Sequence, residues 1–149
     1  MILQPLLRAE IALGPPQELG ETPLGRRRVI PITGGSFRGE KLAGRVLAGG
    51  ADWQVIRSDG VAELDARYTL QTSDGALIYV NNFGYRHGPA DILQRLAAGE
   101  PVDPSLYYMR TTPRFETGAQ RYLWLNRTLC VATGARRAAA VELEVFEVR

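Results

Sequence analysis

Residues 58–75 read SDGVAELDARYTLQTSDG, with the tripeptide Ser-Asp-Gly at both ends and a β-rich run between them. The glycine of each tripeptide can adopt the positive φ that closes a three-residue hairpin loop, and the Ser and Asp side chains can hydrogen-bond the turn backbone. Further β-rich runs lie on the outer sides of both turns. The sequence therefore predicts a meander of at least three antiparallel strands in the middle of the chain.

The rest of the chain adds more strands and one helix. Apolar and turn-forming residues predict strands over residues 3–13, 28–32, 37–47, 53–57, 106–112, 120–132 and 138–148. A helix is predicted between Pro89, at a first-turn position, and Gly99, just past the end. Many strands with one short helix favour an all-β fold, a closed antiparallel β-barrel, with a two-sheet sandwich as the alternative.

Length and composition narrow the classes of function. The chain has 149 residues, 45% of them hydrophobic, which is enough for a single domain over residues 1–149. A net charge of +2 supplies no broad cationic field for nucleic acid, and no apolar run is long enough for a membrane helix. The first residues lack the features of a signal peptide. We therefore expect a cytoplasmic protein with no nucleic-acid or membrane partner.

Motifs for metals and nucleotides are absent from the sequence. Cys130 and His87 are each alone, which excludes cysteine-rich cages and histidine-rich zinc sites. The glycine-rich segment 34–41 departs from the phosphate-loop pattern, because Glu40 stands where that pattern needs lysine. The sequence thus predicts no metal site and no cofactor.

The predicted meander gathers polar side chains on one face. Pairing residues equidistant from the turns places on this face Trp53, Asp65, Arg67 and Asn81. An aromatic ring, an acid, a base and an amide side by side are typical of a lumen that orients a small ligand. In most antiparallel sheets, however, the polar face meets water, and this is the alternative. A register slip of one residue would reverse the faces and bring in Asp52 and Asn82.

A second group of candidates follows the helix. Arg110 lies on the strand predicted over residues 106–112, and Glu116 follows that strand in the sequence. Tyr122, Trp124 and Asn126 share a face of the next predicted strand by the two-residue period. Aromatic residues in strands are usually core, and an Arg and a Glu more often form a surface ion pair worth under ~1 kcal/mol. Their density beside aromatic rings indicates a binding site as the other interpretation.

Six short motifs carry a resemblance. They are Gly34-Gly35-x-Phe37-x-Gly39, Gly49-Gly50-Ala51-Asp52-Trp53-Gln54, Leu64-Asp65-Ala66-Arg67-Tyr68, Thr72-Ser73-Asp74-Gly75, Arg110-Thr111-Thr112-Pro113-x-Phe115-Glu116 and Trp124-Leu125-Asn126. Together they resemble the bacterial and fungal domain of unknown function family 3237, also called uncharacterised protein family 0311, from about the first strand to Val148. The resemblance implies a small antiparallel barrel with a central cavity, similar to calycin or allene oxide cyclase barrels. A 4-hydroxylaminobenzoate lyase is similar to this family, which implies a cofactor-free lyase or isomerase acting on a small aromatic acid.

The leading functional hypothesis is a cavity that binds and converts a small carboxylate. In it, Arg67 or Arg110 binds the anion, Asp65 or Glu116 shuttles a proton as the catalytic group, and the remaining candidates contact the ligand, namely Asp52, Trp53, Asn81, Trp124 and Asn126. The alternatives are a non-catalytic carrier or sensor of small organic ligands and a structural subunit. We also expect a homo-oligomer, because segment 28–32 and the last strand would leave open sheet edges.

Overall fold

The two Ser-Asp-Gly turns form as predicted in the computed structural model, which describes residues 1–149. Gly60 and Gly75 have φ angles of 87° and 89°, and their amides donate to the carbonyl oxygens of Arg57 and Thr72 at 3.0 and 2.9 Å. The turns join β5 (Gly50–Ile56), β6 (Ala62–Thr72) and β7 (Leu77–His87). The predicted register of β6 against β7 is confirmed, because residue 67 pairs with residue 81.

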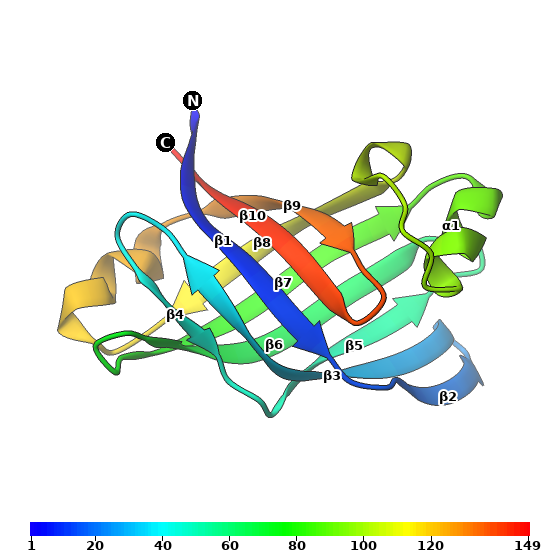
Figure 1. The fold of residues 1–149 in the computed structure, drawn as a ribbon, viewed down its shortest axis with the longest axis horizontal. Coiled ribbons are helices and arrows are strands. Elements are labelled where there is room, and N and C mark those ends of the chain that lie inside the picture. The colour runs from blue at the N-terminus through cyan, green and yellow to red at the C-terminus, as the bar shows by residue number, and fades with distance from the viewer.

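The remaining strands close this meander into a barrel (Figure 1). They are β1 (Leu3–Leu13), β2 (Gln17–Thr22), β3 (Gly25–Arg38), β4 (Ala43–Val46), β8 (Tyr108–Glu116), β9 (Cys130–Arg136) and β10 (Ala140–Val148). Antiparallel pairing runs β1-β10-β9-β8-β7-β6. Strand β3 completes the circle, since it pairs with β1 on one side and with β4 and β5 on the other, and both of these pair with β6. The all-β antiparallel barrel is thus confirmed over the sandwich.

Helical segments lie at opposite ends of the barrel. Helix α1 (Ala90–Ala97) matches the predicted helix, and Gly99 follows it with a φ of 77°. The short 3₁₀ helix η1 (Pro104–Leu106) leads into β8. Figure 1 shows α1 at one end and the 3₁₀ helix η2 (Gln120–Arg127), drawn in gold, at the other. No helix of the structure combines the length and the apolar character that a membrane span requires.

The strand predicted over residues 120–132 is wrong in its first part. Residues 120–127 form η2, and only β9 is extended. The Asn126 side chain accepts from the Thr117 amide and donates to the Thr117 carbonyl, both at 2.8 Å. These bonds replace ladder bonds and close the segment on itself. Because a 3₁₀ helix has three residues per turn, Tyr122, Trp124 and Asn126 do not share a face.

The predicted open edges are also wrong. Segment 28–32 of β3 pairs with β5 along its length, and β2 covers its other side as far as Val29. The last strand, β10, lies between β1 and β9. These two strands therefore give no reason to expect a homo-oligomer, because the barrel itself satisfies both of them, and the homo-oligomer stays a prediction.

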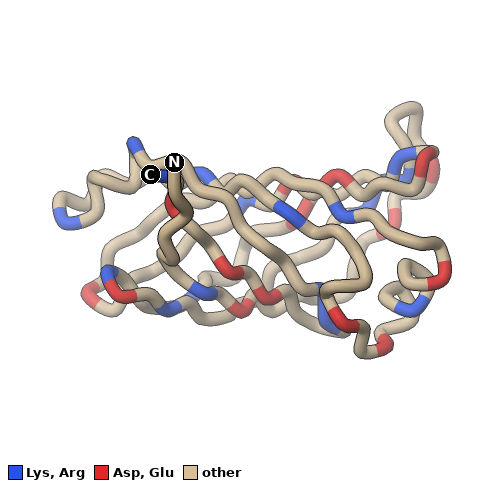
Figure 2. The backbone as a smooth tube through the Cα atoms, turned by 90° about the horizontal axis from the view of Figure 1, so that it is seen from above, with Lys and Arg blue, Asp and Glu red and all other residues tan.

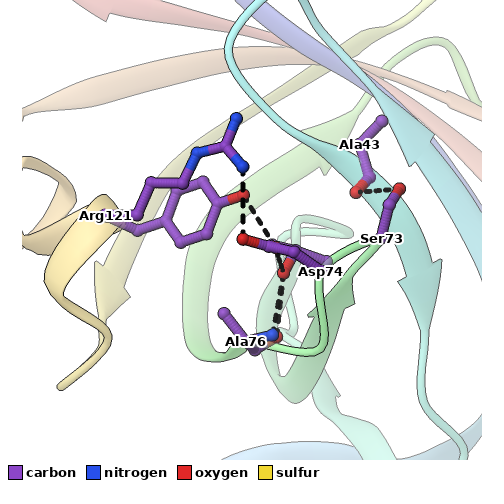
Figure 3. A network of polar contacts seen from close by, with 7 residues as sticks. Ala43, Ser73, Asp74, Ala76 and Arg121 are labelled. Atoms are coloured by element: carbon purple, nitrogen blue, oxygen red, sulfur yellow. Dashed lines mark hydrogen bonds and ion pairs between the residues drawn. The ribbon is translucent and has the colours of Figure 1, made fainter.

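The η2 end of the barrel is filled by apolar side chains and closed by a polar network. Ile78, Val80 and Leu125 are at most 1% exposed. In Figure 3, Asp74 of the β6–β7 turn lies against Arg121 of η2, with Nη1 and Oδ2 3.2 Å apart. Asp74 also accepts hydrogen bonds from the hydroxyl groups of Thr72 and Tyr122. Access to the interior is therefore expected from the α1 end.

Seen from above, Lys and Arg alternate with Asp and Glu over the barrel, so neither sign of charge dominates this view (Figure 2).

Candidate functional site in the barrel lumen

Four polar side chains line the middle of the lumen, and we call them the polar ring: Asp52, Gln54, Asn82 and Thr111. They come from β5, β7 and β8 and border a cavity of about 50 Å³. Asp52 and Asn82 both pair with Ala66 of β6, from opposite sides. Because directly paired residues point to the same face of a sheet, both side chains flank this small methyl group. The alanine leaves the room that the polar ring occupies.

Asp52 is the acid of the polar ring. Its Oδ1 accepts from the Asp65 amide at 2.8 Å, and its Oδ2 accepts from Gln54 Nε2 at 3.2 Å. Burial raises the pKa of Asp52, and this effect outweighs the hydrogen bonds and the nearby Arg86, which lower it. A carboxyl group with a raised pKa can both release and take up a proton closer to neutral pH.

The other three members of the polar ring have unpartnered atoms. Gln54 is 1% exposed, and Asn82 and Thr111 are each 4% exposed. Yet Gln54 Oε1, Asn82 Oδ1 and Thr111 Oγ1 are buried without a hydrogen-bond partner. Leaving a buried polar group unpaired costs about 1–3 kcal/mol, so native proteins rarely tolerate three side by side. Their grouping around a cavity points to a ligand that pairs with them.

Three arginines lie between the polar ring and the α1 end, and we call them the arginine mouth: Arg28, Arg86 and Arg136. Burial lowers the pKa of Arg86 to about 10, with the charge of Arg136 as the next cause. The pKa of Arg136 is lowered by burial and then by Arg28. Three cations thus face one buried acid, Asp52.

Few protein groups balance these cations. Arg28 Nε lies 3.3 Å from Glu18 Oε1, but without the alignment of a hydrogen bond. No ion pair involves Arg86 or Arg136, and one terminal nitrogen of Arg136, Nη1, is buried without a partner. Buried guanidinium groups without acids are the donors that a carboxylate would satisfy through paired hydrogen bonds.

A second pocket leads outward from the arginine mouth. It has a volume of about 330 Å³ and is walled by Leu93 and Leu96 of α1 together with all three arginines. It shares Ile30, Arg86 and Arg136 with the inner cavity. A ligand can therefore extend from the pocket beneath α1 into the polar ring.

A larger hollow lies elsewhere, on the outer face of β1, β9 and β10. It measures about 830 Å³. Some of its charged side chains pair with one another, as Arg8 does with Glu144 at 3.2 Å and Arg137 with Glu142 at 3.1 Å. The others, Glu10, Arg38 and Arg110, are exposed to solvent, whereas the lumen gathers buried polar atoms without partners. We therefore place the candidate site in the lumen despite its smaller volume.

Most residues predicted to form the site lie on the outer face of the barrel, which corrects the expected choice of face. Asp65 and Arg67 form a 3.5 Å ion pair with side chains 36% and 51% exposed. Trp53 is 40% exposed, Asn81 points the same way on β7, and Glu116 is exposed on β8. The apolar side chains of the same strands, such as Tyr68 and Val80, fill the interior because their burial is favourable. Asp52 alone among the predicted residues lines the lumen.

The remaining predicted residues serve local contacts away from the lumen. Arg110 is exposed, and its guanidinium donates to the Met109 carbonyl at 2.9 Å. Trp124 of η2 carries the Lys41 ammonium 4.9 Å from its ring centre, and Asn126 holds the η2 segment as described above. No three side chains of His, Cys, Asp or Glu gather in a way that could hold a metal ion.

Replacing Asp52 with asparagine should stabilise the protein increasingly as pH rises. The native pKa of Asp52 lies above its unfolded value, so the native state binds this proton more tightly. Ionisation of Asp52 therefore lowers the free energy of unfolding of the parent as pH rises from the unfolded-state pKa of this residue through its native pKa. Asp52→Asn has no ionisable group here and does not lose this stability. Thermal melts from pH 3 to pH 8 should show a difference in melting temperature between the two proteins that is smallest in acid and grows as pH rises. A gap that shrinks with rising pH would contradict the buried acid.

Comparisons with known proteins find relatives that match nearly the whole chain in sequence and in fold. The profile of the family described as "Protein of unknown function (DUF3237)" matches residues 1–148. A UPF0311 protein of Rhodopseudomonas palustris is 48% identical over 136 residues, 91% of this chain and 89% of that protein. A crystal structure of a protein of unknown function from the same species superposes with a TM-score of 0.94 at 43% identity, covering 99% of this chain and 97% of the other.

A more distant relative has a named activity. The hydroalkoxylation enzyme phnH of Penicillium herquei is 28% identical over 131 residues, 88% of this chain and 72% of that protein. The crystal structure of an enzyme from the same fungus has a TM-score of 0.70 at 23% identity, over 97% of this chain and 93% of the other, which shows a shared fold.

Proposed function

Because this chain belongs to the DUF3237 family, also named UPF0311, whose members share the barrel, we propose that its lumen binds a small aromatic carboxylate and transfers a proton to or from it. The observation that carries this proposal is the arginine mouth above a single buried acid. Arg86 and Arg136 form no ion pair, and Asp52 is one negative charge against three positive ones, so a ligand carboxylate would supply the missing charge. The aliphatic walls of both pockets, such as Ile30 and Leu96, would contact the ring.

The reaction class follows from the position of Asp52. An acid at the inner end of the cavity, with its pKa raised by burial, can act as general base and then as general acid without a cofactor. Hydroalkoxylation, the activity named for the fungal relative, adds an O–H bond across a carbon–carbon double bond. Its reverse is an elimination, and both directions move one proton at oxygen and one at carbon. We therefore propose a cofactor-free lyase or isomerase, with a carrier of the same ligands as the alternative.

Benzoate should bind to the parent protein and bind about 10- to 100-fold more weakly to Arg136→Gln. Hydrogen bonds to charged groups contribute about 1.5–3 kcal/mol, and glutamine keeps a polar side chain without the charge. Isothermal titration calorimetry at low salt measures both affinities. Arg110→Gln is the matched control, because Arg110 is exposed on the outer face and its loss should leave the affinity unchanged.

Two results would contradict the anion site. One is the absence of any heat of binding for benzoate at millimolar concentration with the parent protein. The other is equal affinity for the parent and Arg136→Gln, which would place the ligand away from the arginine mouth. Saturable binding with no proton transfer on any tested substrate, and an affinity unchanged in Asp52→Asn, would favour the carrier.

A further inference from the structure

We propose that the polar ring selects aromatic carboxylates that carry a hydroxyl group on the far side of the ring, meta or para to the carboxylate; this rests on the proposed function of the lumen. Gln54, Asn82 and Thr111 are then specificity-determining residues. They would distinguish a hydroxylated acid from the same acid without the hydroxyl group.

The chemistry of the polar ring calls for a donor from the ligand. Gln54 Nε2 is already used by Asp52, so its carbonyl oxygen Oε1 is the atom left without a partner. Asn82 Oδ1 and Thr111 Oγ1 are likewise unpartnered. Each Asp52 oxygen accepts one hydrogen bond and keeps a further lone pair. The ring therefore presents more acceptors than donors to the cavity. A hydroxyl group is the small substituent that donates to such acceptors and also accepts from the threonine.

The spacing along β7 sets the position of that hydroxyl group. Arg86 of the arginine mouth and Asn82 of the polar ring are four residues apart, about 13 Å between Cα atoms at the rise of a strand. The inward position between them is Gly84, and the methyl group of Thr111 lies against it, because a Cβ atom there would be 2.5 Å from Thr111 Cγ2. The spacing of the two strand positions therefore places a carboxylate at Arg86 and a substituent at Asn82 on opposite sides of an aromatic ring. A hydroxyl group ortho to the carboxylate would bond to that carboxylate and stay in the arginine mouth.

The two volumes agree with this placement. The inner cavity of about 50 Å³ accommodates a hydroxyl group with the adjoining edge of a ring, and the outer pocket of about 330 Å³ accommodates the remainder. A buried site built to pair with a hydroxyl group discriminates strongly against an analogue without one, because its own polar atoms then stay unpaired. We expect discrimination in this direction here.

The test compares benzoate with 2-, 3- and 4-hydroxybenzoate by calorimetry on the parent, Thr111→Val and Asn82→Leu. The parent should bind the 3- or 4-hydroxy acid at least about tenfold more tightly than benzoate, and should not so favour the 2-hydroxy acid. Both variants should reduce this ratio toward one, because they remove acceptors that only the hydroxy acids use. Thr111→Val keeps the shape of the side chain, so it serves even if Asn82→Leu fails to fold.

The outcomes separate the two proposals. If benzoate binds through Arg136 but the hydroxy acids bind no better, or if the variants leave the ratio unchanged, selection by the polar ring is refuted and the anion site stands. A preference for the 2-hydroxy acid would overturn the proposed placement. If none of the four acids binds, the proposed function fails, and the selectivity fails with it.

Discussion

Replacing Gly84 with alanine is expected to lower the free energy of unfolding by roughly 3 kcal/mol, at the upper end of what overpacking costs. A Cβ atom at residue 84 would lie 2.2 Å from the Arg110 carbonyl oxygen and 2.5 Å from Thr111 Cγ2. The first of these is backbone, so β7 and β8 would have to separate. Unfolding in urea, followed by circular dichroism, measures the loss.

Gly118 is the matched control for this substitution. A Cβ atom there meets nothing within 4 Å, and its φ is not positive, so Gly118→Ala should change stability by no more than about 0.5 kcal/mol. Because Gly84 lies between Asn82 and Arg86 and opposite Thr111, Gly84→Ala should also weaken benzoate binding. Equal stability of Gly84→Ala and Gly118→Ala would mean that the two strands are less tightly packed than the structure has them.

The parts of the fold that were predicted correctly are those with local causes. The Ser-Asp-Gly turns, the register of β6 against β7 and the helix that Gly99 follows all depend on residues within one hairpin or one helical turn. The prediction for the start of segment 120–132 was wrong because its structure depends on a contact outside that segment. Its pattern alternates like a strand, but the Asn126–Thr117 contact, nine residues apart, gives the chain a different set of hydrogen bonds.

Of the candidate site, the predicted residues include only Asp52, because the predicted register is right and the predicted choice of face is wrong. The set with Asp65 and Arg67 was placed inside, whereas the apolar set that includes Ile78 and Val80 has the larger hydrophobic gain from burial. Asn82 and Arg86 continue that apolar set at the same two-residue period. Polar residues at inward positions break the rule that inward residues of a strand are apolar, and such exceptions are expected at functional sites.

The other lumen residues follow the same pattern on strands far apart in the sequence. Gln54, Thr111 and Arg136 each stand at an inward position of a different strand. In its own strand, each of these residues only interrupts the alternation of apolar and polar residues, which is common in strands. Only closure of the barrel, through pairings such as β1 with β3, brings them around one cavity. This convergence depends on long-range topology, so single-strand periodicity could not reveal it.

Replacing Arg86 with methionine should have two effects of opposite sign, a gain in stability and a large loss of anion binding. At neutral pH the guanidinium is charged in both the folded and the unfolded state, so the lowered pKa of Arg86, about 10, is a constant penalty on the native state. Each pKa unit corresponds to ~1.4 kcal/mol, which makes the penalty on the order of 3 kcal/mol. This pKa already includes the opposing attraction of Asp52. Because methionine fills less of the site than arginine and loses part of its packing, we expect a net gain of about 1–2 kcal/mol.

The binding effect should be larger than the stability effect. Methionine retains an apolar stem but removes the forked donors, so benzoate should bind Arg86→Met on the order of 100-fold more weakly than the parent. Arg67→Met is the control: Arg67 is half exposed in a surface ion pair with Asp65, a type of pair worth at most about 1 kcal/mol, and its replacement should leave binding unchanged. Thermal melts and calorimetry on the same samples measure both quantities. A less stable Arg86→Met that still binds benzoate would show Arg86 to be a structural residue, whereas a more stable protein that no longer binds would show that the arginine mouth is kept for its ligand.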